Sequence, residues 1–481
     1  MKKWIDKYKA LSAPVKSSLW FAICNIVQKG IALVSTPIFT RIMTTDQYGI
    51  YTVYQSWYQI IVIFATLELS AGVFNNGLTH FPEEKKIFVS TLQGLSTTIT
   101  AILFLVYCIN IEFWNRTFDL PSLFIFAMFV QLLFEPAYLF WSAEQRYTYR
   151  YRGLIFTTML IAVGSPLLGI FTVISTEYKA EARVLSFVFV QFIIGLFFYI
   201  YNFRRGKSFF SAKYWRYALN FSLPLIPHYL SMTVLNQSDR IMINNMVGSS
   251  EAAIYGIAYT LAMMMTIVTG AINNSFIPFT YQHIKKKEFS KIGIVSNALL
   301  LLVGGVTIIA MAFGPELIML FATKEYYEAI WIMPPVAATV FFMFLYPLFA
   351  NVEFYFEKTK FIMVASCVGA GLNVILNYVF ISASGYYAAG YTTLFCYIIF
   401  SLAHYIAYKR IIEEKKDEIE PIYNVKFIFA ISLVMLFAML AMLVVYEQAV
   451  IRYGIVLIAC GLLISKRSEI TSIIKQLKKA G

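Results

Sequence analysis

The sequence predicts an all-α polytopic membrane protein with about 14 transmembrane helices. We expect two parallel six-helix lobes around a central cavity, plus two C-terminal helices. Three observations support this fold class. Of the 481 residues, 59% are hydrophobic and 14% are charged, whereas soluble proteins carry about 25% charged residues. Apolar windows long enough to cross a bilayer recur along the chain, and the first half contains a segment that resembles one in the second half.

The apolar windows give the expected helices in order. They fall at residues 18–40, 48–71, 87–110, 120–142, 153–175, 183–203, 217–240, 251–277, 292–313, 328–352, 361–381, 388–408, 426–446 and 449–465. Pro224 and Pro227 are expected to interrupt the seventh of these helices, because proline cannot donate the backbone hydrogen bond that a helix requires.

Loop charges predict the orientation of these helices. With the N-terminus placed in the cytoplasm, inner segments hold 31 of the 39 Lys and Arg residues, and Lys29 alone lies within a span. Outer loops hold seven, namely Arg41, Arg116, Lys179, Arg183, Arg240, Lys324 and Arg452. Because cytoplasmic loops are enriched in basic residues, we expect a multi-pass protein of the cytoplasmic membrane with both termini in the cytoplasm.

The helices and charged stretches divide the chain into seven expected segments. They are a basic interfacial N-terminus (1–17), an N-lobe of helices 1–6 (18–204), a cytoplasmic linker (205–216), a C-lobe of helices 7–12 (217–410), a charged cytoplasmic linker (411–425), helices 13–14 (426–466) and a basic cytoplasmic tail (467–481).

The two lobes are expected to be copies of one another. Arg41-Ile42-Met43 recurs 199 residues later as Arg240-Ile241-Met242, and Tyr48-Gly49-Ile50 recurs as Tyr255-Gly256-Ile257. The same offset places Lys29 opposite His228. The two copies are six helices apart. Because this number is even, both copies have the same orientation in the membrane, and the lobes should be parallel repeats.

Ionisable and polar side chains within the spans are the candidate functional residues, because each is costly in hydrocarbon and normally faces protein or water. The candidates for binding a phosphate or sugar are Asn25, Gln28, Lys29, Arg41, His228 and Arg240. The candidates for ion coupling or gating are Glu68, Glu135, Asp239 and Glu353.

Each candidate also has a structural interpretation. Lys29 could reach toward the interface, and His228 could be a packed, hydrogen-bonded residue. Arg41 and Arg240 lie near the outer ends of their spans, where an interfacial anchor or an Asp239–Arg240 pair would also explain them. Glu68 and Glu135 could pair with Lys29.

Several function classes receive no support from the sequence. The basic residues form no nucleic-acid-binding motif, although the net charge is +13. The five cysteines lie apart within apolar segments and predict no metal site. Phosphate-loop and hydrolase motifs are absent, so we expect no catalytic residues and no cofactor.

Three segments resemble the polysaccharide and O-antigen flippases of the multidrug/oligosaccharidyl-lipid/polysaccharide exporter superfamily. They are residues 36–54 (TPIFTRIMTTDQYGIYTVY), residues 236–259 (NQSDRIMINNMVGSSEAAIYGIAY), and residues 353–397 with Asn373-Val374-Ile375-Leu376-Asn377 and Gly390-Tyr391-Thr392-Thr393. The similarity in helix order and loop size extends over essentially the whole chain.

This resemblance implies a monomeric flippase that turns undecaprenyl-diphosphate-linked sugar repeat units from the inner to the outer leaflet by alternating access. The implied partners are the lipid-linked oligosaccharide, membrane lipids and polysaccharide polymerase machinery. Coupling to a proton gradient, a sodium gradient or the membrane potential is open at this stage. The alternatives are a cation-coupled multidrug exporter of the same fold and a membrane polymerase or ligase, which the short outer loops disfavour.

Overall fold

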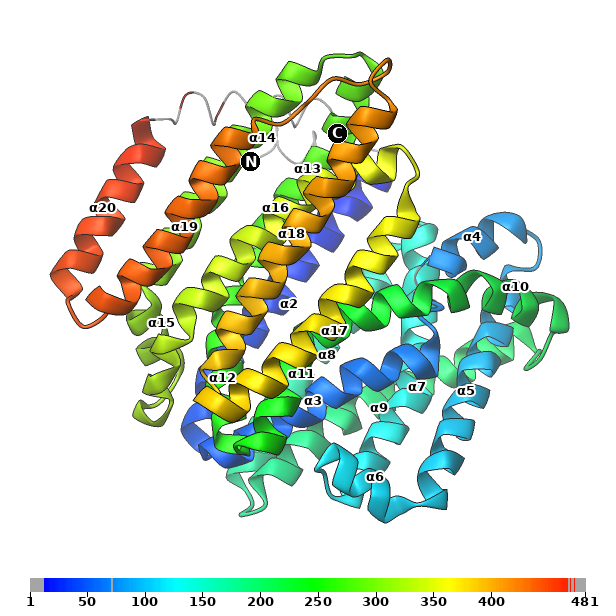
Figure 1. Ribbon diagram of the computed structural model, residues 1–481. Helices are drawn as coiled ribbons and strands as arrows, with labels where there is room; N and C mark the ends of the chain where they lie inside the picture. Colours follow the sequence, from blue (N-terminus) through cyan, green and yellow to red (C-terminus); the bar gives the residue numbers. More distant parts are fainter. Residues whose placement is uncertain (1–12, 71, 466–467, 469–470, 472–481) are drawn as a thin grey trace, which may run out of the picture. The chain divides into compact units, whose positions relative to one another are not determined.

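The computed structural model describes residues 13–70, 72–465, 468 and 471. The predicted interfacial segment therefore lies mostly outside the described residues, and so does nearly all of the basic tail. Every regular element among the described residues is a helix (Figure 1). The chain forms two compact units, Met1–Thr233 and Val234–Gly481.

The first unit contains the elements expected for helices 1–6 and the start of helix 7. They are α2 (Ala13–Ile42), α3 (Thr45–Thr66), α4 (Gly72–His80), α5 (Lys85–Ile109), α6 (Ile111–Phe118), α7 (Ser122–Tyr147), α8 (Tyr151–Ile174), α9 (Lys179–Gly206), α10 (Ala212–Ser222) and the 3-10 helix η1 (Leu223–Leu225).

The second unit begins within α11 (Ile226–Met246). It continues with α12 (Ser249–Met263), α13 (Met265–Lys285), α14 (Phe289–Ala312), α15 (Gly314–Phe321), η2 (Lys324–Trp331), α16 (Met333–Tyr355), α17 (Thr359–Ser384), α18 (Ala388–Glu414), α19 (Val425–Val445) and α20 (Ala449–Ser465).

The helices account for all fourteen predicted spans. Among the described residues, eleven helical stretches are long and apolar enough to cross a membrane, with α12 and α13 forming one stretch, Ser249–Lys285. The other three predicted spans correspond to α3, α11 and the shorter apolar helix α20. α11 carries the candidate residues His228, Asp239 and Arg240, and Glu68 follows the end of α3.

The expected proline interruption of helix 7 is confirmed. α10 ends at Ser222, a single 3-10 turn spans Leu223–Leu225, and α11 starts at Ile226. Pro224 lies inside the 3-10 turn and Pro227 lies in the first turn of α11, where its missing N–H costs nothing.

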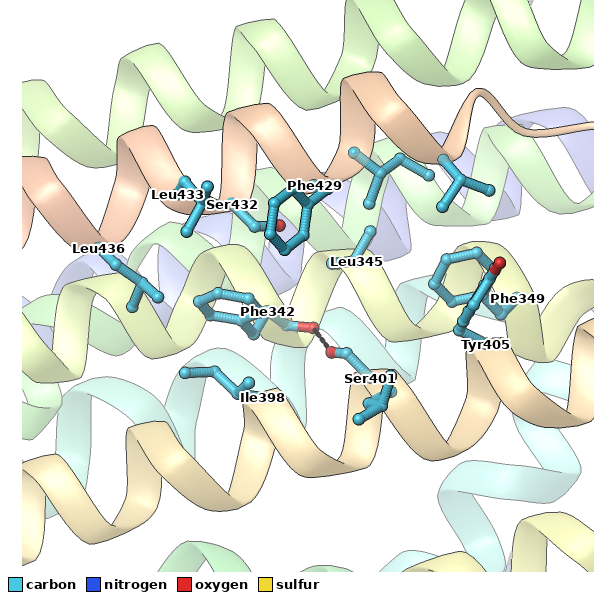
Figure 2. A pocket seen from close by; sticks show the side chains of 13 residues that line it. Phe342, Leu345, Phe349, Ile398, Ser401, Tyr405, Phe429, Ser432, Leu433 and Leu436 are labelled. Atoms are coloured by element: carbon cyan, nitrogen blue, oxygen red, sulfur yellow. Dashed lines mark hydrogen bonds between the residues drawn. The ribbon is translucent and has the colours of Figure 1, made fainter.

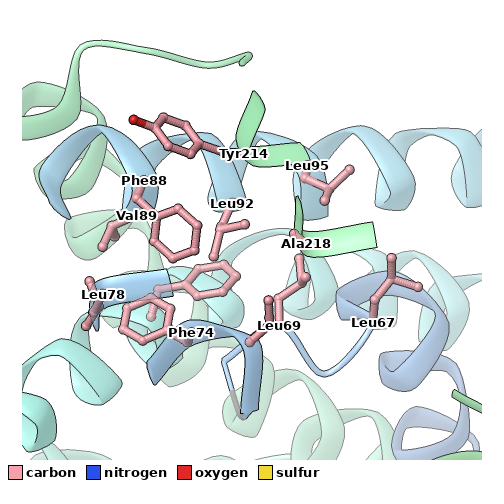
Figure 3. Packing of buried hydrophobic residues seen from close by; sticks show 12 residues of the cluster. Leu67, Leu69, Phe74, Leu78, Phe88, Val89, Leu92, Leu95, Tyr214 and Ala218 are labelled. Atoms are coloured by element: carbon pink, nitrogen blue, oxygen red, sulfur yellow. The ribbon is translucent and has the colours of Figure 1, made fainter. Parts of the chain in front are cut away.

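The segment before this break packs against the first unit. Tyr214 and Ala218 of α10 are buried together with Phe88 and Leu92 of α5 and Phe74 of α4 (Figure 3). The division between the units consequently falls between Thr233 and Val234, not within the linker expected at 205–216. Burial of the apolar face of α10 explains the difference.

An ion pair also holds α10 to the loop before α5. Lys213 Nζ lies 2.8 Å from Glu84 Oε2, and the Tyr214 hydroxyl donates to the same oxygen. The hydrogen bond from Lys213, and to a smaller extent the one from Tyr214, lowers the pKa of the Glu84 carboxyl.

The two C-terminal helices are docked against the second unit. Arg452 of α20 makes a bidentate ion pair with Glu316 of α15, at 2.7 and 2.8 Å, and donates to the Ala312 carbonyl. Buried Tyr423 donates to the Leu348 carbonyl at 2.5 Å. The segment expected to be a charged linker at 411–425 therefore has a buried apolar side that packs on α16.

An apolar crevice of about 320 Å³ lies between α16, α18 and α19 (Figure 2). Phe342, Leu345 and Phe429 line it, and the Ser401 hydroxyl donates to the Phe342 carbonyl at 3.2 Å. The other lining residues that carry a hydroxyl are Tyr405 and Ser432, and none of the lining residues is charged, so the crevice offers no charge to a phosphate.

The two units repeat the same helix pairings. In the first, α7 packs on α9, α9 on α8 and α5 on α7; in the second, α16 packs on α18, α18 on α17 and α14 on α16. These are the fourth–sixth, fifth–sixth and third–fourth helices of each set. The shared pairings support the predicted duplication.

Candidate functional site

The most completely hydrogen-bonded polar group in the second unit surrounds Asp239 of α11. This carboxylate is fully buried. Its Oδ2 accepts from the Tyr255 hydroxyl at 2.5 Å and from the Thr393 hydroxyl at 2.9 Å, while its Oδ1 accepts from Asn377 Nδ2 at 2.5 Å. Three neutral donors thus replace the water that a carboxylate requires.

A second layer of side chains holds these donors in place. Ser238 donates to Asn373 Oδ1 at 2.9 Å, Asn373 Nδ2 donates to Thr393 Oγ1 at 3.1 Å, and the Thr392 hydroxyl donates to Asn377 Oδ1. The network joins α11, α12, α17 and α18. We name these residues the Asp239 cluster (Ser238, Asp239, Tyr255, Asn373, Asn377, Thr392 and Thr393).

Arg240 does not form an ion pair with its neighbour Asp239. Its guanidinium donates to Gln237 Oε1 at 2.6 Å and lies 4.3 Å from the centroid of the Tyr259 ring. Among the described residues no ion pair joins Arg240 to Asp239. The two adjacent residues therefore contribute to separate contacts, and the structure does not support the suggested Asp239–Arg240 pair.

Glu353 of α16 forms a second buried site in the same unit. Its Oε1 lies 2.7 Å from Nδ1 of His404 in α18, and both side chains are fully buried. Glu353 Oε2 and His404 Nε2 are buried without a hydrogen-bond partner in the described part of the chain.

In the first unit, Glu135 of α7 is held by neutral donors. The Tyr58 hydroxyl donates to Glu135 Oε2 at 2.5 Å, and Gln131 Nε2 donates to the same oxygen at 2.7 Å. The Tyr54 hydroxyl fixes Gln131 through a 2.9 Å bond to its Oε1. Glu135 accordingly pairs with α3 and α7, not with Lys29.

Glu68 lies where α3 ends. Leu67 and Glu68 both have positive φ angles, 49° and 51°, and Glu68 is half-buried. The break releases this carboxylate from the helix that carries Tyr54 and Tyr58, so Glu68 is separate from the Glu135 group.

The polar face of α2 is the least covered part of the predicted site. Asn25, Gln28 and Lys29 are exposed. In the described part of the chain, Lys29 makes no hydrogen bond or ion pair within the protein. The Lys29 ammonium is therefore available to a ligand.

Arg41 and Arg240 share a local geometry at aligned positions. Arg41 Nη1 donates to the Pro37 carbonyl at 2.7 Å, and Arg240 Nη1 donates to the Asn236 carbonyl at 3.3 Å. Both acceptors lie four residues earlier and are themselves 199 residues apart. Arg41 is exposed whereas Arg240 is buried. His228, the counterpart of Lys29, is half-buried beside Tyr229.

Sequence reasoning missed the partners of the buried acids: Tyr255, Asn373, Asn377, Thr393 and His404. The spacing of Asn373 and Asn377 could have indicated a shared helix face, since residues four apart are neighbours on a helix. His404 gave one weaker signal, an ionisable residue in an apolar span. Among the described residues, no group of three His, Cys, Asp or Glu side chains could hold a metal ion.

This all-helical arrangement is the fold of the MOP-superfamily transporters. A lipid II flippase MurJ structure in an inward closed conformation is similar with a TM-score of 0.68 at 14% identity, covering 94% of this chain and all of that one. An inward-facing MATE family transporter gives a TM-score of 0.59 at 13% identity, covering 82% and 99%.

The chain belongs to the polysaccharide biosynthesis protein family, which matches residues 15–283. The MatE family matches residues 224–379. The "Lsg locus putative protein 1" of Haemophilus influenzae is 23% identical over an alignment of 374 residues, with 73% of this chain and 87% of that protein covered. An "uncharacterized membrane protein" of the same organism is 22% identical over 366 residues, covering 73% and 86%.

Proposed function

We propose that this protein is a flippase that moves undecaprenyl-diphosphate-linked oligosaccharide repeat units from the inner to the outer leaflet of the cytoplasmic membrane. The observation that carries the proposal is membership of the polysaccharide biosynthesis family on a transporter fold. Polysaccharide synthesis requires a multi-pass membrane protein of this kind if the sugars are carried on a lipid that must cross the bilayer.

Lys29 is the proposed contact for the diphosphate. It lies mid-span in α2 next to Gln28, it is exposed, and it makes no hydrogen bond or ion pair with the described residues. A lysine ammonium is a compact charge that binds phosphate well. Arg41 and His228 are proposed to assist it, and Asn25 and Gln28 to bind sugar hydroxyls. Arg240 is proposed to act through the position of α11, since its guanidinium is buried and hydrogen-bonded.

The membrane potential supplies part of the proposed driving force. Moving one elementary charge across 100 mV changes the free energy by about 2.3 kcal/mol. An inside-negative potential therefore favours outward movement of an anionic headgroup while its lipid tail stays in the bilayer. The proposed partners are the lipid-linked substrate, membrane lipids and the polymerase that uses the product; the protein is proposed to work as a monomer without a cofactor.

A multidrug exporter is the second candidate function, because the MatE family matches residues 224–379. The sequence also raised an enzyme as an alternative. The families and structures that this chain resembles are named for transport, flipping or polysaccharide biosynthesis, which favours the transporter.

Reconstitution in vesicles tests the proposal. Fluorescent undecaprenyl-diphosphate-linked oligosaccharide is incorporated in both leaflets, and its movement is followed by a glycosidase that cannot cross the membrane. We expect the wild-type protein to make the inner pool accessible. Efflux of a cationic dye without glycolipid movement would establish the exporter instead.

Variants of Lys29 test the diphosphate contact in the same assay. We expect Lys29→Ala to lose about tenfold or more in rate, since a charge-assisted hydrogen bond contributes about 1.5–3 kcal/mol. Lys29→Arg retains the charge and is expected to retain most of the rate. Because Lys29 is exposed and makes no hydrogen bond or ion pair with the described residues, thermal unfolding of both variants should match the wild type. Wild-type flipping by Lys29→Ala would remove Lys29 from the site.

A further inference from the structure

Glu353 and His404 are the most deeply buried acid–base pair in the second unit, and no step described so far uses them. Both side chains are fully buried, and a single 2.7 Å hydrogen bond joins Oε1 to Nδ1. The other atom of each group, Glu353 Oε2 and His404 Nε2, has no hydrogen-bond partner in the described part of the chain. Most buried polar atoms are satisfied, so a pair with an orphaned atom on each partner has few groups that could stabilise a net charge.

Charge balance indicates that the pair holds one proton. With Glu353 ionised and His404 neutral, the pair would hold one uncompensated negative charge away from water, which is costly. Adding one proton gives an imidazolium beside a carboxylate and a net charge of zero. The proton then lies in the Nδ1–Oε1 bond, whose length is typical of a charge-assisted hydrogen bond.

The position of Glu353 favours the protonated pair for a second reason. Glu353 lies in the last turn of α16, which ends at Tyr355. The C-terminus of a helix carries partial negative charge and disfavours a nearby anion. A positive imidazolium beside Glu353 offsets that charge.

Aromatic rings surround the imidazole from three helices. The ring centroids of Phe400, Tyr346 and Phe361 lie 4.6, 5.4 and 6.3 Å from that of His404. The Phe400 and Phe361 rings are nearly perpendicular to the imidazole, at 86° and 82°, and the Tyr346 ring is tilted by 31°. Because both side chains are fully buried, we expect the proton to leave only when the contact between α16 and α18 opens.

The charged groups of the neighbouring elements are engaged elsewhere. At the start of α17 and the end of α18, Lys358 and Glu414 pair with each other at 2.7 Å. Tyr355 contacts Tyr281 of α13, and Tyr423, next to α19, contacts Leu348 and Phe349 of α16. Among the described residues of these elements and of α12 and α14, none gives Glu353 or His404 a further ion pair or a second hydrogen bond.

We propose that Glu353 and His404 form a proton-binding site, and that release of this proton when α16 and α18 separate couples transport to the proton gradient. The pair binds one proton as a unit. The site itself does not depend on the transported substrate; only the coupling step rests on the proposed function.

Nuclear magnetic resonance of the full-length protein tests the site without any substrate. The chain has four histidines, so selective ¹⁵N labelling gives four imidazoles, and the loss of one signal in His404→Gln identifies His404. We expect the His404 ring to be doubly protonated at pH 7 in the wild type and neutral in Glu353→Gln, which keeps an oxygen for the hydrogen bond. A neutral His404 in the wild type, or one unchanged in Glu353→Gln, would overturn the proposal.

Infrared spectroscopy of His404→Gln provides an independent readout if Glu353→Gln fails to fold. Without the imidazole, the buried Glu353 carboxyl is expected to hold the proton itself and show a carboxylic acid band. That band should vanish in the Glu353→Gln/His404→Gln double variant. An ionised Glu353 in His404→Gln would show that this buried position tolerates a net negative charge, and it would contradict the proposal.

Transport under an imposed pH difference tests the coupling. One pH unit is a tenfold ratio of proton activity, and we expect the wild-type rate to change several-fold with such a gradient. Glu353→Gln and His404→Gln should lose this response, whereas the matched control Glu414→Gln, which breaks the exposed Lys358 pair, should keep it. An equal response in all variants would overturn the coupling. If the wild type moves dye and no glycolipid, the proposed function fails, and dye efflux under the same gradient decides the coupling.

Discussion

At the scale of single residues, each acid buried in the second unit is stabilised by a different chemistry. Asp239 is held by two hydroxyls and an amide, all neutral, whereas Glu353 is held by one histidine and retains an orphaned oxygen. A fully satisfied network fixes a unique packing. We therefore propose that Asp239 positions α11 against α17 and α18, and that Glu353 binds the proton.

Substitution of Asp239 tests this assignment. Asp239→Ala leaves the donors of Tyr255, Asn377 and Thr393 without an acceptor, and we expect it to lower the free energy of unfolding by about 3 kcal/mol. Asp239→Asn should cost less, because the two hydroxyls can turn and accept from the new amide. Thermal unfolding in detergent measures both.

The matched control for this series is Asp417→Ala. Asp417 is exposed in the turn after α18, so its loss should leave the unfolding temperature unchanged. If Asp239→Ala were as stable as this control, the Asp239 cluster would not hold the helices together.

At the scale of elements, close helix contacts depend on small residues. Gly195 of α9 faces α7: a Cβ atom at this position would lie 2.5 Å from the Phe134 carbonyl oxygen. Small residues let backbones approach, and this is a common basis of helix packing in membranes. The α7–α9 contact, which recurs as α16–α18, is therefore specified in part by a single missing methyl group.

Gly195→Ala is expected to force α7 and α9 apart and to destabilise the protein by about 1–3 kcal/mol. Gly164→Ala in α8 is the control, because the nearest atom to its added Cβ would be 3.9 Å away. Alanine favours the helix over glycine by about 1 kcal/mol, so the control should be neutral or slightly more stable. Unfolding curves that coincide for the two variants would contradict a tight α7–α9 contact.

At the scale of the whole molecule, the distribution of charge is expected to set the orientation in the membrane. The sequence places 31 basic residues on the predicted cytoplasmic side and seven on the other side. The loop after α13 illustrates the bias, with three consecutive lysines at 285–287, whereas the segment after α6 has Asp119 and no lysine. The negative surface potential of the cytoplasmic leaflet attracts basic loops to the cytoplasmic face.

Reporter fusions test this orientation. Alkaline phosphatase, which is active only outside the cytoplasm, should be active when fused after Asp119 and inactive when fused after Lys286 or at the C-terminus. A fluorescent protein that folds only in the cytoplasm should give the opposite pattern. Activity of the phosphatase at the C-terminus would invert the topology and place the Glu353 end of α16 on the outer face.

Much of the fold was determined by the sequence alone. The fourteen apolar windows correspond to helices, the proline interruption lies at Leu223–Leu225, and the 199-residue offset matches the equivalent contacts of Arg41 and Arg240. These features are local, since hydrophobicity, proline geometry and repeat spacing are properties of contiguous residues.

Only the tertiary structure decided which polar residues meet. The hydrogen bonds from Asn377 and Thr393 to Asp239, and from His404 to Glu353, join residues 138, 154 and 51 positions apart. The sequence predicted that Asp239 and Glu353 would be costly in the membrane, but it did not indicate which residues would be their hydrogen-bond partners. A buried charge must be paired or hydrogen-bonded. Helix packing, and not distance along the chain, determines which residue lies close enough to do this.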